Sequence, residues 1–273
     1  MTPSIAVIAA LCLPADARVD QRVPKKLLVE NGAPTAADKR QINEGIEELM
    51  WIAALKPATI GVPAYRDDTR EYLEIAVISA TLRAGAKIAR LTELIHRAIP
   101  YPVFLILNEP LGTCLSLCHL RWSQGQSGQT VLDGPLVTAN LTEEENRRGG
   151  AEGTSDSALS PLPPVASSPF LSSLSLTAQP RQDLHAFYEG WVRCFEAFAA
   201  ARLTSTFTLC ETPSAYHARR EALVEHQRLT QETSSLRARA AKETQLNRRV
   251  ELNLQLKQLE ARLTEQKSRL LPT

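Results

Sequence analysis

The chain begins with a continuous apolar run over residues 5–13, after which polar residues follow. Pro14 ends this run far short of the roughly 20 residues that a membrane-spanning helix needs. The first cation, Arg18, comes after the run, whereas a secretory signal places its cations before it. We therefore expect a buried segment of a cytoplasmic protein with no membrane contact.

The central part of the chain has the pattern of a βαβ unit. Residues 72–82 are apolar and rich in β-branched side chains, and the apolar positions then recur at helical spacing over residues 88–99. A short, wholly apolar run at 103–107 is typical of a strand that is buried on both faces. We expect residues 114–121 to pair with it as a hairpin and residues 130–141 to form an edge strand, which makes the sheet mixed.

Two amphipathic segments predict helices that pack on this sheet. Apolar positions recur at near-helical spacing between residues 36 and 55. Residues 184–199 carry a broad apolar stripe that includes much of the aromatic content of the chain, so this helix should dock onto the sheet. We expect a strand at 171–176 before it and a polar connector at 15–22.

The C-terminal segment is predicted to be helical. Residues 214–271 contain no glycine or proline, and Thr212-Pro213 suits an N-cap followed by proline at the first helical position. Five leucines step by four, three, four and seven residues, which is a heptad seam of about three repeats. The seam consists of Leu252, Leu256, Leu259, Leu263 and Leu270. An exposed seam is costly in water, so it should pair with itself or with a partner helix.

Together these patterns predict an α+β fold. It comprises a mixed sheet with one βαβ unit and a hairpin, flanking helices, and a C-terminal long helix or helical hairpin. We expect an α+β head at 1–142 and a disordered or inserted linker at 143–168, whose Ser, Pro and Ala content cannot offset its ordering entropy. A docking strand and amphipathic helix at 169–212 then complete the head, and 213–273 form a coiled-coil-like arm.

The net charge of the chain is close to zero, but the charges are distributed unevenly between the C-terminal segment and the rest. The 273 residues carry 31 Lys and Arg against 30 Asp and Glu, which gives no global argument for nucleic-acid binding. Residues 214–273, however, hold 12 cations against 7 anions, a net +5, and the remainder holds 19 against 23, a net −4. The five cysteines are odd in number and scattered, so we expect reduced thiols rather than a disulfide framework.

Two basic features are candidates for binding an acidic partner or phosphates. One is the adjacent pair Lys25 and Lys26 at the start of an element. In the other, Leu246, Val250 and either Asn253 or Leu254 share a helix side, so that Arg249 and Asn253 flank an apolar seam. The candidate binding residues are Lys25, Lys26, Asn247, Arg248, Arg249 and Asn253. A solvated helix face is the alternative interpretation of the second feature.

No motif assembles a catalytic or metal site. Cys114 and Cys118 would lie about 13 Å apart on one face of a strand with His119 on the other face, so buried structural cysteines are favoured over a zinc site. His96 is expected at the edge of an apolar helix stripe. We therefore nominate no catalytic residue, metal ligand or cofactor.

A metal-dependent nuclease centred on Asp68, Glu71 and Glu74 remains an alternative. A restriction-type nuclease core also places a lysine two residues after a strand acid. Leu73 and Ala76 stand at those positions, which favours surface acids.

Several motifs, taken in order, resemble a bacterial family classed as a domain of unknown function. They are Val23-Pro-Lys-Lys26, Glu47-Glu-Leu-Met-Trp51 with Ala54-Leu-Lys-Pro57, Glu71-Tyr-Leu-Glu-Ile-Ala-Val77, Ile95-His-Arg-Ala-Ile-Pro-Tyr-Pro102, Leu115-Ser-Leu-Cys-His-Leu-Arg121 and Glu243-Thr-Gln-Leu-Asn-Arg-Arg-Val-Glu-Leu-Asn253. The resemblance spans nearly the whole chain except for about 141–168, which looks like an insertion. It implies that Pro100 and Pro102 matter together with the candidate binding residues, and it carries over no catalytic residue.

Members of the family it resembles tend to be encoded beside helicases and DNA methyltransferases in restriction-like or phage-defence clusters. This implies a defence accessory role. Our leading hypothesis is a non-catalytic adaptor subunit of such a complex, which binds a helicase or methyltransferase subunit through its arm and forms a homodimer through the same arm. The alternatives are a nucleic-acid-binding module that uses the basic arm to contact DNA, and the metal-dependent nuclease.

Overall fold

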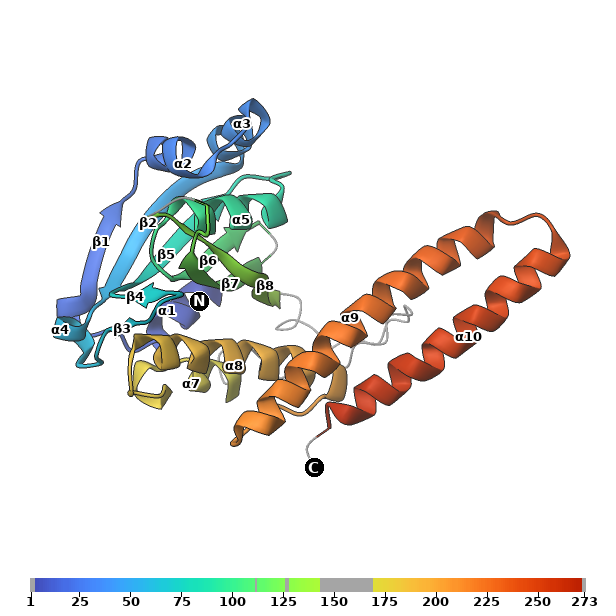
Figure 1. Ribbon diagram of the computed structural model, residues 1–273. Helices are drawn as coiled ribbons and strands as arrows, with labels where there is room; N and C mark the ends of the chain where they lie inside the picture. Colours follow the sequence, from blue (N-terminus) through green and yellow to red (C-terminus); the bar gives the residue numbers. More distant parts are fainter. Residues whose placement is uncertain (1–2, 111, 126–127, 143–168, 272–273) are drawn as a thin grey trace, which may run out of the picture. The chain divides into compact units, whose positions relative to one another are not determined.

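The computed structural model describes residues 3–110, 112–125, 128–142 and 169–271 (Figure 1). The chain divides into two compact units, and the boundary between Phe195 and Glu196 falls within one helix. We call the described residues up to Phe195 the head unit and those from Glu196 the arm unit. The linker expected at 143–168 lies outside the described residues.

The head unit is built on a six-stranded mixed sheet with the strand order β1-β2-β5-β6-β7-β8. The strands are β1 (Arg18–Arg22), β2 (Ile46–Leu55), β5 (Ile75–Leu82), β6 (Val103–Glu109), β7 (Gly112–Trp122) and β8 (Thr130–Thr142). Only β5 and β6 run parallel, and α5 (Ile88–Ala98) crosses between them, as a parallel pair requires. The predicted βαβ unit, hairpin and edge strand are thus confirmed, and so is the α+β fold class.

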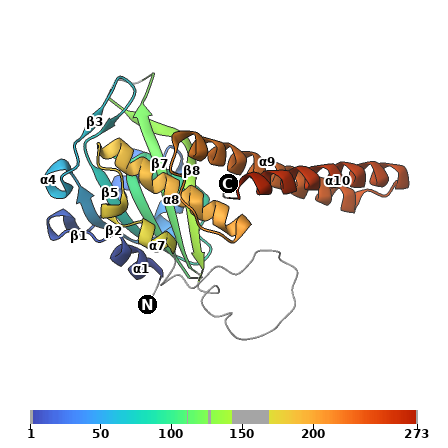
Figure 2. The same cartoon turned by 90° about the horizontal axis from the view of Figure 1, so that it is seen from below.

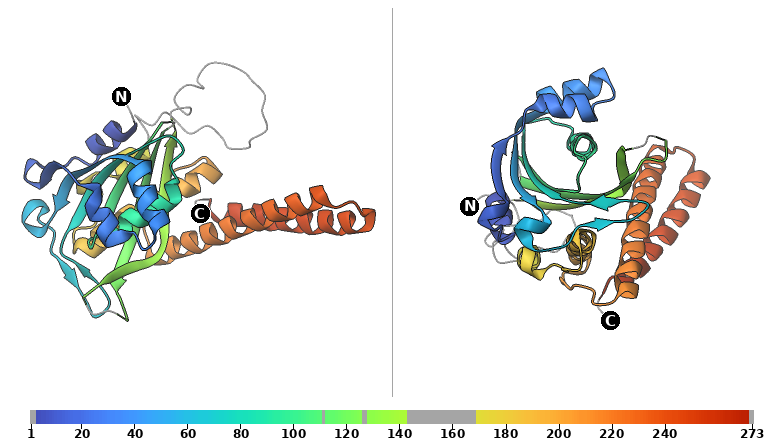
Figure 3. Two further views of the ribbon diagram at one scale, coloured as in Figure 1. Left: turned by 90° about the horizontal axis from the view of Figure 1, so that it is seen from above. Right: turned by 60° about the vertical axis from the view of Figure 1, so that its left-hand side comes forward.

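Helices cover both faces of the sheet. On one face lie α2 (Lys25–Gly32), α3 (Ala36–Gly45) and α5, and their apolar side chains form one core with those of β2, β5 and β6. On the other face lie α1 (Pro3–Ala10), α7 (Pro169–Ser173) and α8 (Leu184–Thr204), which Figure 2 shows in front of the strands. The sheet curves around α5 (Figure 3). The smaller elements are α4 (Pro57–Ile60), the two-stranded β3 (Tyr65–Arg66) and β4 (Glu71–Tyr72), and the 3₁₀ turns Ala15–Ala17 and Leu176–Ala178.

The prediction of one helix over residues 36–55 is wrong in its second half. The helix α3 ends at Gly45, where a Cβ atom would lie 2.8 Å from Leu91 Cδ1, and β2 begins at Ile46. The strand β2 pairs with β1 on one side and with β5 on the other. A continuous apolar run fits a strand between two neighbours as well as a buried helix, and the partner strands decide between them.

Two shorter predictions are also wrong. The connector at 15–22 contains β1, an edge strand whose exposed side chains give no apolar alternation. The docking strand at 171–176 is instead helical, as α7 followed by a 3₁₀ turn. Its apolar residues fit a compact turn because Trp191 Nε1 donates a hydrogen bond to the Leu174 carbonyl oxygen at 2.9 Å.

The arm unit contains the end of α8 and a hairpin of two helices, α9 (Pro213–Lys242) and α10 (Leu246–Arg269) (Figure 1). The Thr212 hydroxyl accepts a hydrogen bond from the Ala215 N–H at 3.3 Å, which confirms the N-cap. Of the two arm forms that the sequence left open, the structure therefore has the hairpin. Within the part of the chain described above, no helix is both long and apolar enough to cross a membrane.

Candidate functional site

The leucine seam of α10 packs within the hairpin. Leu259 forms a buried cluster with Leu229 and Leu236 of α9, and three other seam leucines, at 252, 256 and 263, pack against that cluster. Leu270 lies in a second cluster with Ala200 and Ala222. All five predicted seam residues therefore have apolar partners in the arm unit, and the cost of an unpaired seam no longer argues for a partner helix at these positions.

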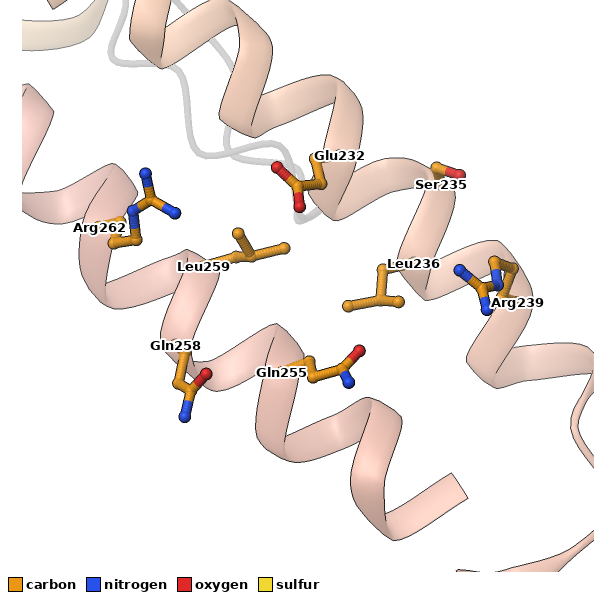
Figure 4. Close-up of a pocket in the computed structure, with 8 residues that line it drawn as sticks. All are labelled: Glu232, Ser235, Leu236, Arg239, Gln255, Gln258, Leu259 and Arg262. Atoms are coloured by element: carbon orange, nitrogen blue, oxygen red, sulfur yellow. The ribbon is translucent and has the colours of Figure 1, made fainter. Parts of the chain in front are cut away.

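A groove of about 420 Å³ lies between α9 and α10, beside the packed seam leucines (Figure 4). Leu236 and Leu259 point toward one another across it. Its rim is polar, with Glu232 and Arg239 on α9 and Gln255 and Arg262 on α10. The groove thus lies at the margin of the hairpin core, where Leu236 and Leu259 are flanked by polar side chains.

The buried leucines of the hairpin core should stabilise the arm unit. Leu229 is fully buried in the hairpin core, so Leu229→Ala should destabilise the arm unit by about 2–5 kcal/mol through lost burial and a cavity. Val224 lies on the same helix but is 57% exposed, so Val224→Ala should change stability by less than about 0.5 kcal/mol. Thermal melting followed by far-UV circular dichroism measures both. Equal effects of the two substitutions would contradict the packing described here.

A second apolar stripe of α10 has no such cover. Leu246, Val250 and Leu254 follow one another at four-residue steps, so they share one side of the helix. They are 64%, 50% and 58% exposed. The first half of α10 therefore packs one apolar face into the hairpin and leaves another in water.

Cations surround this stripe in the turn region that we call the hairpin tip, residues 239–257. The tip holds five cations against Glu243 and Glu251, a net +3. The cations are Arg239, Lys242, Arg248, Arg249 and Lys257. Among the described residues none of the five forms an ion pair, whereas cations nearer the base of the hairpin do. Three of the five excess positive charges of residues 214–273 therefore lie in the tip, beside the apolar stripe.

The structure brings four of the six candidate binding residues together at this tip. Asn247, Arg248, Arg249 and Asn253 are all exposed on the first turns of α10. A hollow of about 490 Å³ is lined by Arg248 together with Arg239 and Lys242, which come from the end of α9. The last two residues were missed from the sequence because only the hairpin fold brings them beside Arg248.

The other two candidates, Lys25 and Lys26, belong to the head unit. The Lys25 ammonium group donates hydrogen bonds to the carbonyl oxygens of Asn43, at 3.2 Å, and Ile46. Burial and the nearby Arg83 lower the pKa of Lys25. Lys26 is exposed and forms an ion pair with Glu30 at 3.5 Å. Lys25 thus links α2 to the junction of α3 and β2 through two of its three N–H donors.

The acids of the nuclease alternative do not converge. Glu71 pairs with Arg66 at 3.2 Å, Glu74 pairs with Lys56 at 3.1 Å, and Asp68 is exposed. In the described part of the chain, no group of three or more His, Cys, Asp or Glu side chains could hold a metal ion. Cys114 and Cys118 are buried in β7, and burial raises the pKa of these thiols to about 12 and about 11, which keeps both protonated.

A polar cluster in the head unit was not predicted. The hydroxyl group of Tyr72 lies 2.5 Å from His119 Nδ1, and His119 Nε2 lies 2.9 Å from a Glu189 carboxylate oxygen. Beside them Arg70 contacts His185 at 3.3 Å and pairs with Asp133 at 3.0 Å. The cluster joins β4, β7, β8 and α8, whose residues lie too far apart in the sequence for spacing to reveal them.

This cluster has the components of an acid–histidine–hydroxyl triad but not its reactivity. The hydroxyl group in the position of a nucleophile is the phenol of Tyr72, which lies in the interior of the head unit. Tyr72 is fully buried, and burial raises its pKa far above the usual value. The chain of hydrogen bonds therefore fastens α8 to the sheet.

Comparison with known proteins places the chain in a family without giving it an activity. No curated protein and no solved structure matches it. The family model "Domain of unknown function (DUF4391)" matches residues 11–263 of the 273. The resemblance to a domain of unknown function is thus confirmed over most of the chain, which belongs to the DUF4391 family.

Proposed function

We propose that this protein is a non-catalytic adaptor whose hairpin tip binds an acidic, amphipathic helix of a partner protein. The observation that carries the proposal is the exposed stripe of Leu246, Val250 and Leu254 among cations that form no ion pair with any residue the structure describes. A partner helix with apolar residues at the same spacing would cover the stripe, as in helix-in-groove recognition. Acidic residues beside them would meet the tip cations and speed the encounter.

The apolar stripe favours a protein over nucleic acid as the partner. Fully burying an exposed leucine or valine side chain contributes about 1.5–3 kcal/mol. The three side chains at the tip are half exposed or more, so covering them contributes about half of that value each. Phosphate groups would engage the cations but would leave these side chains in water. A protein helix uses both features at once.

The family resemblance suggests the setting of the partner. Related chains tend to be encoded beside helicases and DNA methyltransferases, so we propose a subunit of such a restriction-like or phage-defence complex in the cytoplasm. The adaptor proposal is also consistent with the polar cluster of the head unit, because the His119 nitrogens and the Tyr72 hydroxyl contact other protein groups there.

A labelled acidic peptide tests the proposal. The probe is a helical peptide with leucines at four-residue steps and glutamates between them, and its binding to the full chain is followed by fluorescence anisotropy. The stripe variant Leu246→Ser/Val250→Ser/Leu254→Ser and the charge variant Arg248→Glu/Arg249→Glu should each weaken binding at least tenfold. The exposed control Val224→Ser should bind like the wild type, and the same peptide with lysines in place of glutamates should not bind.

Binding that survives in the stripe variant would overturn the proposal. Far-UV circular dichroism of each variant checks that the hairpin is intact, since the substituted side chains are exposed and contribute little to stability.

Nucleic-acid binding is the second candidate, and one observation favours it. Arg239, Lys242 and Arg248 line one hollow together with Glu243 and Glu251, and its net charge of +1 favours a phosphate group. Binding of a short DNA duplex should then weaken steeply with salt and fail in the charge variant while persisting in the stripe variant. The charge variant weakens binding in both cases, so the stripe variant separates the two functions: it should lose the peptide and keep the DNA.

A further inference from the structure

The head unit carries a large groove that the proposed function does not use. Its volume is about 1110 Å³, at the upper end of the range of roughly 300–1,000 Å³ for small-molecule sites, so it has room for several side chains of a macromolecular occupant. Its walls are the C-terminal ends of α2 and α5, the residues around β4, and the start of β8 with the end of β7. Figure 1 shows α2 and α5 on the same face of the sheet.

Exposed apolar side chains gather in this groove. Among the described residues of the head unit, five large apolar side chains are exposed, and three of them line it. These are Leu73, Tyr101 and Val131, which are 49%, 38% and 36% exposed. Trp122 and Leu132 add further apolar lining. The groove therefore offers an apolar floor of its own, comparable to the apolar stripe of the hairpin tip.

The charge of the groove is opposite to that of the tip. Glu30, Glu71 and Glu93 line it against Arg97, a net −2. The carboxylates already have partners: Glu93 pairs with Arg90 and Arg97, Glu30 with Lys26, and Glu71 with Arg66. The side chains of Lys26 and Arg66 are 80% and 73% exposed. An ion pair whose cation is this exposed contributes little to stability, so Glu30 and Glu71 can exchange these partners for an incoming cation.

Two helix ends add to this negative potential. Gly32 at the end of α2 packs so closely on α5 that a Cβ atom there would lie 2.6 Å from Ala98 Cβ and 2.7 Å from the Leu94 carbonyl oxygen. The C-terminal ends of both helices thus lie side by side at the groove, and each carries a partial negative charge. A cationic occupant is favoured by the carboxylates and by the helix ends alike.

We infer that the occupant is the hairpin tip of a second copy of this chain. The inference rests on the proposed function of the tip. It adds that the chain itself presents a matching surface. The groove has three exposed apolar side chains and lining residues of net negative charge, and the tip has three exposed apolar side chains and net positive charge. Two copies that exchange tips reciprocally form a closed dimer. Self-association and binding of an acidic partner then compete for the same tip.

A charge-swap experiment tests the inference on the full chain. Sedimentation equilibrium over a concentration series should detect a dimer of the wild type. The tip variant Arg248→Glu/Arg249→Glu and the groove variant Glu30→Arg/Glu71→Arg should each raise the dissociation constant at least tenfold. The matched control Glu44→Arg/Glu47→Arg, which changes the same charges elsewhere on the head unit, should dimerise like the wild type.

Mixing the two swapped variants is the decisive step. An acidic tip then meets a basic groove in one contact and a basic tip meets an acidic groove in the other, so a mixed dimer should form. A misfolded variant could not be rescued in this way. A wild type that stays monomeric at all concentrations, or variants that fail to associate when mixed, would overturn the inference. If that monomer still binds the acidic peptide, only the self-association fails and the proposed function stands.

Discussion

Replacing Trp191 by alanine should lower the free energy of unfolding of the head unit by about 3–5 kcal/mol. Trp191 is fully buried between α8 and the sheet, where its ring lies 4.8 Å from Phe104 and 5.0 Å from Phe187, measured between ring centroids. Its indole N–H also donates to the Leu174 carbonyl oxygen. The substitution therefore leaves a large cavity together with a buried carbonyl group that has lost its donor.

Urea unfolding followed by near-UV circular dichroism measures this effect. Trp191→Phe is the matched control, because it keeps an aromatic ring and removes mainly the hydrogen bond, so its cost should be about 1–2 kcal/mol. A loss below about 1 kcal/mol for Trp191→Ala would contradict the packing of α8 on the sheet.

Acid should destabilise the head unit through His96. This residue is almost fully buried, its Nε2 atom lies 3.0 Å from the Ser116 hydroxyl, and burial lowers its pKa from 6.5 to about 3. Between these two values the unfolded chain binds a proton that the folded chain does not. The stability that the neutral His96 side chain provides is fully present above pH 6.5. Between pH 6.5 and about pH 3 the free energy of unfolding should fall by about 1.4 kcal/mol per pH unit. Burial also lowers the pKa of His185, which acts in the same direction.

Tryptophan fluorescence isolates this response, since Trp51, Trp122 and Trp191 all lie in the head unit. The urea midpoint of the wild type should decrease from pH 7 to pH 5. His96→Gln removes the titrating group and should flatten the decrease, although it also lowers stability at pH 7. His217→Gln, at an exposed position in the arm unit, should leave the pH dependence unchanged. An equally steep decrease in His96→Gln would rule out His96 as the cause.

Local patterns predicted four of the six sheet strands because these strands have apolar runs that differ from the neighbouring helical spacing. The run at 103–107 is buried on both faces in β6, and the change to helical spacing after Gly85 marks α5. The strand β2 was missed because its apolar positions also fit a helix that continues α3. The choice depends on its pairing with β1 and β5, which no local pattern contains.

The candidate site shows the same division. The heptad spacing identified the seam of α10 from its leucines, but spacing within one helix does not say whether the partner is another chain or α9. The sequence predicted that Leu246 and Val250 share a helix side and nominated Arg248 and Arg249, but the exposure of the stripe and the place of Arg239 and Lys242 beside it depend on the hairpin fold. The polar cluster around His119 depends on residues from four elements, so tertiary contacts alone could reveal it.

Hydrogen exchange of the full chain with and without the acidic amphipathic peptide most directly tests whether the hairpin tip is a docking surface. Mass spectrometry locates the amides that become protected on binding. The expected result is slower exchange over residues 239–257, with no such change in the stripe variant Leu246→Ser/Val250→Ser/Leu254→Ser. Protection confined to other parts of the chain, or protection of the tip that persists in the stripe variant, would contradict the proposal.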